Sequence, residues 1–239
     1  MKKIISSIAI FSLMLLCFTA CGTDSQKSDG QNAGGQSTES QSTPTPDQSQ
    51  EKQEVEPEQT ADNASDSTAQ GETLSGKHHV TIEIEKYGTI EAELDADIAP
   101  ITVTNFMNLA KSKFYDGLTF HRIISGFMIQ GGDPDGNGTG GSGKNIKGEF
   151  RSNGVENSLS HKRGVLSMAR SADPNSASSQ FFIMHQDADY LDGEYAAFGT
   201  VTKGIEIVDK ICQDTPVVDD NGTVLAENQP KITKITVVD

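Results

Sequence analysis

Strict alternation of apolar and polar side chains is the strongest structural constraint in this 239-residue chain. It occurs in two neighbouring runs, VTIEIE at 80–85 and IEAELD at 90–95, with Tyr87-Gly88 between them. Successive side chains of a strand point to opposite faces of a sheet, so each run predicts a strand with one buried face. Two such runs around a short glycine-containing turn predict an antiparallel hairpin.

Short apolar runs between glycine- and aspartate-rich segments predict further strands. They lie at 127–130, 164–168, 180–184, 196–201 and 231–238. Helices are predicted at 99–112, which begins with Pro100, and at 204–213, where Ile205, Val208 and Cys212 share a face. We therefore expect a mainly β fold, a closed antiparallel β-barrel capped by two α-helices. Cys212 is expected to be a small core residue rather than a reactive thiol.

Composition separates a tether from a folded domain. Residues 22–77 contain Val55 and Leu74 as their only large apolar side chains and are rich in Ser, Gln, Gly and acidic residues. Such a segment cannot bury enough apolar area to offset the entropy of ordering, so we expect a disordered tether over 22–77 and one domain over 78–239. The net charge of the chain is −15, and neither part has a basic patch, which argues against nucleic-acid binding.

The first 21 residues have the form of a bacterial export signal. Lys2 and Lys3 precede an apolar run of 17 residues over 4–20, which is short for a spanning helix of about 20 residues. The run ends in FTAC, which resembles a lipobox and implies a diacylglyceryl thioether on Cys21 and an anchor in the lipid bilayer. A cleaved secretory signal and an uncleaved anchor are the alternatives. Only Cys212 then remains in the domain as a thiol, so no internal disulfide is expected.

Several motifs lack the context that their usual chemistry needs. The run DPDGNG from Asp133 matches the first half of an EF-hand loop, but the twelfth position is Lys144 instead of Glu. The glycines of 138–143 match a dinucleotide-binding pattern without the required strand and helix. The histidines have no metal-ligand spacing, so we expect no metal and no other cofactor. His121 is expected to point to the opposite face of its strand from Arg122.

The candidate site lies between residues 120 and 199. This stretch begins FHRIISGFMIQGGDPDGNGTGG and ends GVLSMARSADPNSASSQFFIMHQDADYLDGEYAAFG. Arg122 and Gln130 stand among Phe, Met and Leu, without a nucleophile–base pair or a metal cluster. Alternation sends Gln180 and Phe182 to one surface and Phe181 to the other. A polar group beside an aromatic ring predicts a site that grips a neutral, apolar peptide group.

The segments FHRII, GFM, QGGD, NGTGG, LSMA, SQFFI and YLDG, in this order, resemble the signature of the cyclophilins, the peptidyl-prolyl cis–trans isomerases. The resemblance covers about residues 79–238 and implies a closed eight-stranded antiparallel β-barrel capped by two α-helices. It also implies that proline-containing segments are the substrates and Arg122 the catalytic residue. The implied proline pocket consists of Phe127, Met128, Phe182 and Leu191. The other implied substrate contacts are Gln130, Gly138, Ala169, Arg170, Ser171, Gln180, Tyr190 and Tyr195.

Three positions depart from the best-known members of that family. Tyr190 replaces Trp, Tyr195 replaces His, and Arg170 replaces Asn. The missing indole N–H implies weak cyclosporin binding, and the charge of Arg170 predicts a preference for acidic residues beside the proline.

These features lead us to expect a monomeric isomerase, lipid-anchored on the extracytoplasmic face of the cell membrane, that assists the folding of exported proteins. The main alternative is a module of the same fold that grips proline-containing segments without turnover. A lipoprotein that captures small solutes for a transporter is a second alternative, which would require a larger, two-lobed chain.

Overall fold

A computed structural model of the chain describes residues 72–239. The predicted signal, Cys21 and nearly all of the predicted tether lie outside the described residues. Within residues 72–239, no helix combines the length and the apolar character needed to cross a membrane. Packing begins shortly before residue 78, because Leu74 contacts the core and its backbone N–H donates to Thr104 Oγ1 at 2.8 Å.

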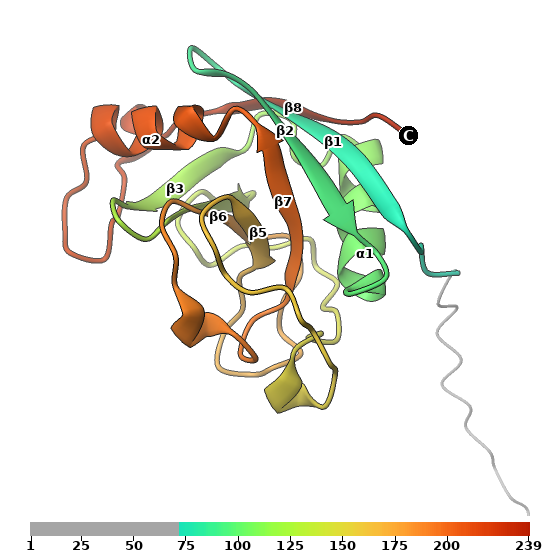
Figure 1. The fold of residues 1–239 in the computed structure, drawn as a ribbon. Helices are drawn as coiled ribbons and strands as arrows, with labels where there is room; N and C mark the ends of the chain where they lie inside the picture. Colours follow the sequence, from blue (N-terminus) through green and yellow to red (C-terminus); the bar gives the residue numbers. More distant parts are fainter. Residues whose placement is uncertain (1–71) are drawn as a thin grey trace, which may run out of the picture. The chain divides into compact units, whose positions relative to one another are not determined.

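An antiparallel sheet of eight strands dominates the domain (Figure 1). Its strands are β1 (Lys77–Ile84), β2 (Gly88–Asp95), β3 (Thr119–Ile124), β4 (Met128–Asp133), β5 (Val165–Met168), β6 (Phe181–Met184), β7 (Ala197–Lys203) and β8 (Ile232–Val237). The helices are α1 (Pro100–Lys111), α2 (Ile205–Asp214) and three short 3-10 turns, η1 (Arg151–Asn153), η2 (Asp189–Leu191) and η3 (Ala226–Asn228). The predicted mainly β class with two α-helices is confirmed.

The sheet is an open half-barrel, so the expectation of a closed barrel was wrong. The strand order β3-β4-β6-β5-β7-β2-β1-β8 leaves β3 and β8 as edges. Among residues 72–239, the starts of these two edges meet at an isolated bridge between Thr119 and Lys231, beside which Ile232 exchanges backbone hydrogen bonds with Gly117 and Leu118. Pro230 accepts a hydrogen bond from the backbone N–H of Phe120 at 2.9 Å, but it has no N–H to return one. The ladder therefore stops at this point and the barrel stays open.

The larger apolar cluster lies between one face of the sheet and the two helices. Phe106 of α1 packs against Phe181 and Phe198, with ring centroids 5.3 and 5.2 Å away. The buried positions of α1 have the helical spacing that the sequence predicted. Cys212 of α2 packs against the same cluster, and burial raises the pKa of its thiol to about 11. This thiol stays protonated at neutral pH, as expected for a core residue.

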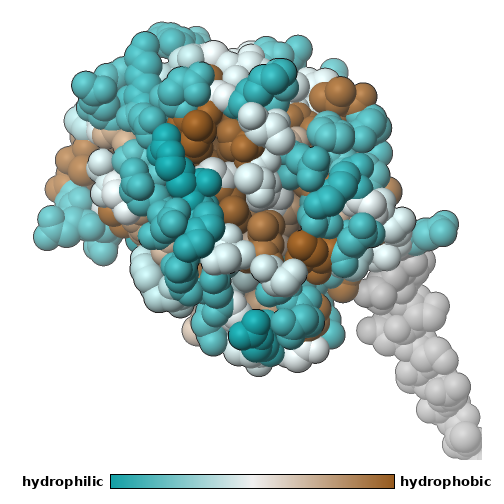
Figure 2. Space-filling view, in the orientation of Figure 1, coloured by the Kyte–Doolittle hydropathy of each residue, from teal (hydrophilic) through white to brown (hydrophobic). Residues whose placement is uncertain are grey.

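A smaller apolar cluster lies on the opposite face of the same strands. Its buried members are Met128, Val165, Phe182, Met184, Ala188, Leu191 and Ala197. Neighbouring residues divide between the clusters: Ile129 and Phe181 belong to the larger one, Met128 and Phe182 to the smaller. The predicted alternation at Phe181 and Phe182 is thus confirmed. On the face drawn in Figure 2, the apolar patches are separated by hydrophilic side chains.

Candidate active site

A β-bulge in β3 places Arg122 beside the smaller cluster. Phe120 pairs with Gly131 and Arg122 pairs with Gln130, so His121 is an extra residue on this strand. Without the bulge, Phe120 and Arg122 would point to the same face, because they are two positions apart. With it, Phe120 fills the larger core and Arg122 borders a cavity on the other face.

The smaller cluster opens to solvent as a cavity of about 210 Å³. The residues that line it are Arg122, Phe127, Met128, Gln130, Ala169, Arg170, Phe182, Leu191 and Tyr195. All of them were predicted site residues, so the structure brings the predicted proline pocket together. Phe182 and Tyr195 meet edge to face with ring centroids 6.0 Å apart. The cavity has the size and apolar walls for a small ring, with polar groups along its edge.

Hydrogen bonds connect Arg122 with the glycine-rich loop after β4. Arg122 Nη1 donates to Gln130 Oε1 at 3.2 Å, and Gln130 Nε2 donates to Gln180 Oε1 at 2.8 Å. Gln180 Nε2 donates to the carbonyl oxygens of Gly138 and Gly140, at 3.0 and 2.8 Å. This series of contacts fixes the orientation of both side-chain amides at the edge of the cavity.

Asn221 also holds Arg122, and the sequence analysis did not single it out. Arg122 Nε donates to the backbone oxygen of Asn221 at 2.8 Å. Within residues 72–239, Arg122 Nη2 makes no hydrogen bond, so its two N–H groups are available to a ligand. A guanidinium keeps its charge and has donors only, so it can stabilise a lone pair but does not act as an acid.

A second cavity, of about 460 Å³, adjoins the first. Of the residues that the family resemblance implied as further substrate contacts, Gly138, Ser171 and Gln180 line this cavity. Tyr190 borders neither cavity: its side chain is 72 % exposed and stacks on Phe127 with ring centroids 6.1 Å apart. Tyr190, an implied substrate contact, thus lies beside Phe127 on the rim of the proline pocket.

Arg170 borders both cavities and is held by the protein itself. Its guanidinium carbon lies 5.1 Å from the ring centroid of Phe150 and 4.7 Å from that of Tyr195. Its Nε and Nη2 donate to the backbone oxygen of Glu194 at 3.1 and 3.0 Å. The side chain is 14 % exposed. Arg170 therefore supports the Tyr195 wall of the proline pocket as well as carrying charge.

His121 borders a further cavity together with Arg122, so the expectation that the two side chains point to opposite faces was wrong. Its ring is buried, and neither ring nitrogen has a hydrogen-bond partner among residues 72–239. Burial lowers the pKa of His121, although the carboxylate of Asp133 acts in the opposite direction. The imidazole is therefore neutral at neutral pH.

The site offers a cationic donor and side-chain amides beside an apolar cavity. Among residues 72–239, no group of three or more His, Cys, Asp or Glu side chains is placed to hold a metal ion. The arrangement suits a neutral peptide whose backbone binds the amides and whose apolar ring enters the cavity.

Comparison with known proteins identifies the family. The family described as "Cyclophilin type peptidyl-prolyl cis-trans isomerase/CLD" matches residues 79–237. A peptidyl-prolyl cis-trans isomerase of Helicobacter pylori is 46 % identical over 144 residues, which are 59 % of this chain and 85 % of that protein. Peptidyl-prolyl cis-trans isomerase B of Bacillus subtilis is 49 % identical over 123 residues, covering 52 % and 82 % of the two chains.

A solved structure of the same family has a similar fold. The crystal structure of a cyclophilin type isomerase of Cryptosporidium parvum, in the presence of the dipeptide Ala-Pro, has a TM-score of 0.59 and 33 % identity. It covers 67 % of this chain and 99 % of that one. This chain belongs to the cyclophilin-type peptidyl-prolyl cis–trans isomerases and is an isomerase enzyme. The resemblance inferred from the sequence is confirmed, and the two non-enzymatic alternatives are set aside.

Proposed function

We propose that this isomerase assists the folding of exported proteins from a lipid anchor on Cys21, with Arg122 as its catalytic residue. The catalytic part rests on one observation: Arg122 lines the apolar cavity, and its Nη2 group has no hydrogen-bond partner among the described residues. The location rests on the sequence of residues 1–77, nearly all of which lie outside the described residues.

Arg122 would act on the electronic change that accompanies rotation. Amide resonance gives the X–Pro bond a rotational barrier of about 18–20 kcal/mol. In the twisted state resonance is lost and the prolyl nitrogen regains a lone pair. Arg122 would donate a hydrogen bond to this lone pair, which the planar ground state does not offer. An interaction made only in the transition state raises the rate, so Arg122 would be an electrostatic stabiliser.

The remaining site residues would hold one side of the bond still. The apolar cavity would enclose the proline ring, and the amide of Gln130, aligned by Gln180, would bind the backbone beside it. The larger cavity would receive the residues that precede or follow the proline. With the ring fixed, the other side of the bond turns without leaving the groove.

Replacing Arg122 by Ala in the full chain tests the catalytic role. In a protease-coupled assay with a proline-containing peptide, we expect kcat/KM to fall about 100-fold or more, as for other transition-state donors. The Kd of the peptide should change less than tenfold, because the apolar walls remain. Arg151→Ala is the matched control, since Arg151 pairs with Glu156 at 3.4 Å and borders neither cavity. A folded Arg122→Ala variant with the parent's kcat/KM would show that another group lowers the barrier.

The order of features in the first 77 residues supports the membrane anchor. Two lysines, an apolar run and Cys21 stand in the order of a lipoprotein signal, and the acidic segment that follows offers no charge attraction to anionic lipids. Two acyl chains on one cysteine would suffice for stable attachment, whereas a single chain gives marginal binding.

Cys21→Ser in an exporting bacterial cell tests the anchor. We expect the parent in the membrane fraction with a diacylglyceryl group on its N-terminal cysteine, measured by mass spectrometry, and the variant released from the membrane. Cys17→Ser is the matched control, because it removes a neighbouring thiol and should leave the protein membrane-bound. Retention of Cys21→Ser in the membrane would instead support an uncleaved apolar anchor.

Proline-containing segments of exported proteins would be the partners of this monomeric enzyme. Weak cyclosporin binding belongs to the same proposal, because Tyr190 has a hydroxyl on an exposed ring where an indole N–H is the usual donor.

A further inference from the structure

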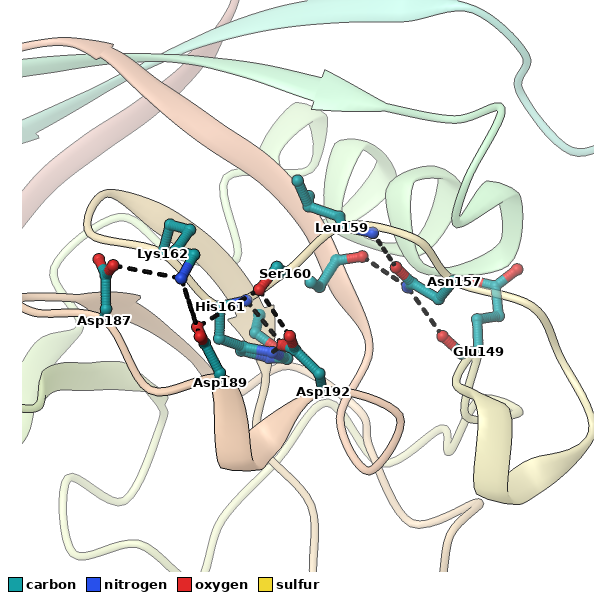
Figure 3. Close-up of polar contacts among 11 residues, drawn as sticks. Glu149, Asn157, Leu159, Ser160, His161, Lys162, Asp187, Asp189 and Asp192 are labelled. Atoms are coloured by element: carbon teal, nitrogen blue, oxygen red, sulfur yellow. Dashed lines mark hydrogen bonds and ion pairs between the residues drawn. The ribbon is translucent and has the colours of Figure 1, made fainter.

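A buried histidine that the proposed mechanism does not use lies behind the proline pocket. His161 precedes β5, and its side chain is 1 % exposed. Its ring stacks on Phe182, a wall of the cavity, with centroids 6.1 Å apart and an angle of 19° between the planes. Its Nδ1 lies 2.8 Å from Asp192 Oδ1 (Figure 3). Its Nε2 lies 2.9 Å from Ser167 Oγ.

The partners of the ring define where its proton resides. The carboxylate of Asp192 only accepts hydrogen bonds, so Nδ1 carries the proton and donates it. Nε2 is then the acceptor for the hydroxyl of Ser167. Burial lowers the pKa of His161, although Asp192 and Asp189 act in the opposite direction. The neutral Nδ1–H form therefore satisfies every polar atom of the ring at neutral pH.

The order Asp192, His161, Ser167 resembles a hydrolase triad, but the geometry excludes that use. Ser167 is fully buried in β5, where it pairs with Phe182 of β6. Its hydroxyl therefore has no access to a substrate in the cavity. What these hydrogen bonds do is fix the position of the imidazole.

Asp192 connects this imidazole with the rim of the cavity. It directly follows Leu191, another cavity wall, at the end of η2. Its Oδ1 also accepts the backbone N–H of His161 at 2.8 Å, and its Oδ2 accepts the hydroxyl of Ser160. The turn that carries Leu191 is thus attached to the same ring on which Phe182 is stacked. The buried side chain of His161 therefore contacts Phe182 directly and holds Leu191 through Asp192.

We propose that His161 and Asp192 are a positioning pair that sets the distance between Phe182 and Leu191, and with it the fit of the proline ring. The inference rests on the proposed use of the cavity as the proline pocket. Neither residue of the pair touches the substrate. The proline ring of the substrate is enclosed in the ground state and in the twisted state alike, so a poorer fit weakens the binding of both states equally. Loss of the pair therefore raises KM and leaves kcat nearly unchanged.

Two variants remove the pair in different ways. His161→Phe keeps a buried ring against Phe182 but makes no hydrogen bond. Asp192→Asn keeps the shape and the Oδ1 acceptor for both N–H groups of His161, and weakens the hydrogen bond to Nδ1–H by removing the charge. The control is Asp187→Asn, which removes an equal charge from the same region, where Asp187 pairs with Lys162 at 3.3 Å (Figure 3).

The experiment measures kcat and KM of the full chain for a proline-containing peptide, together with thermal unfolding. We expect both variants to raise KM about threefold to tenfold, the effect of losing about one net hydrogen bond, with kcat within about twofold of the parent. The control should match the parent. Nitrogen NMR of the parent's imidazole should show a proton on Nδ1.

Folded variants with the parent's KM would overturn the proposal, and so would a parent imidazole protonated on Nε2 alone. If His161→Phe does not fold, Asp192→Asn decides, because it preserves side-chain volume and the backbone hydrogen bond. A failure of the Arg122 proposal would appear in kcat of Arg122→Ala, whereas a failure of this one would appear in KM, so the two can be distinguished.

Discussion

Groups of the protein partly compensate the charge of Arg170, and the rest of its field reaches the substrate groove. Its donors bind backbone oxygens of Glu194 and Ser171, and Nη2 lies 3.7 Å from the carboxylate of Glu194. A partly exposed pair of this kind reduces the field that reaches the cavity without cancelling it. Arg170 should therefore bias substrate choice weakly.

We expect the parent to turn over peptides with Glu beside the proline about twofold to threefold faster than peptides with Lys, and the difference to shrink as salt is raised. Arg170→Asn should abolish the difference, and Arg170→Lys should keep it. The measurement is kcat/KM for a matched peptide pair at two ionic strengths. Equal turnover of both peptides by the parent would contradict this expectation.

The site residues could be predicted from the sequence, but the residues that hold them in place could not. Arg122 and the cavity residues were identified because they stand in an ordered series of segments that resembles a known family. Asn221 gave no signal, because it holds Arg122 through a backbone oxygen that every residue possesses. His161 had the appearance of an ordinary isolated histidine, since its partners Ser167 and Asp192 come from separate segments.

The N-terminus of α1 is capped by a residue distant in the sequence. Ala99 provides no side-chain cap and Pro100 has no N–H to satisfy. The next two N–H groups, of Ile101 and Thr102, donate to the buried carboxylate of Glu149 at 2.9 and 2.8 Å. A negative charge at a helix N-terminus is also favoured by the helix dipole.

Loss of this distant cap should destabilise the domain. Glu149→Ala leaves two N–H groups without partners, and we expect the free energy of unfolding to fall by about 2 kcal/mol. Glu149→Gln keeps one acceptor and should cost about half as much. Urea unfolding provides the measurement, with exposed Glu156→Ala as a control that should stay within about 0.5 kcal/mol of the parent. Equal stability of all the variants would show that water satisfies these groups.

The positions of the strands were predicted well where the sequence pattern of apolar residues was regular. The runs that predicted β5, β6 and β7 lie within a few residues of the observed strands. β3 lacked a clear pattern because the extra residue, His121, interrupts its alternation. The hairpin turn was expected at Tyr87-Gly88, but Gly88 already pairs with Ile84, and the loop spans 85–87.

Acid should destabilise the whole domain in two separate pH ranges. The pKa values of His121 and His161 are lowered by burial, so the unfolded chain binds protons on these residues that the folded chain does not. Stability therefore falls as the pH drops below about 6.5. The carboxyl pKa values of Asp133 and Asp192 are lowered mainly by hydrogen bonds that outweigh burial, so their contribution is lost only below about 3.9.

Urea unfolding between pH 7.5 and 5 checks the upper range. We expect the free energy of unfolding to decrease by at most about 1.4 kcal/mol per pH unit for each buried histidine. His121→Leu should reduce this slope, while Val218→Thr, a change without a titratable group at an exposed position, should leave it unchanged. A slope that is the same in His121→Leu and the parent would rule out His121 as a source.

At the level of the whole molecule, the apolar runs predicted seven of the eight strands and the family resemblance implied eight, but the prediction that the barrel closes was wrong. Closure depends on whether the first and last edges can exchange hydrogen bonds, and those edges are far apart in the sequence. At the point where they meet, Pro230 accepts a backbone hydrogen bond from Phe120 but has no N–H to donate one. Hydrophobic patterning does not report on such a contact, because it describes faces of strands and not their edges.

The open seam is nevertheless covered along β3. The backbone N–H of Ile123 donates to the oxygen of Gly222, and the N–H of Val224 donates to the oxygen of His121. The loop around Gly222 thus occupies the hydrogen-bonding positions of the edge strand that carries Arg122. Extended chains tend to add to any free sheet edge and to aggregate there. Because this edge is covered, an extended, proline-containing substrate can bind in the groove but cannot add to the sheet as a further strand.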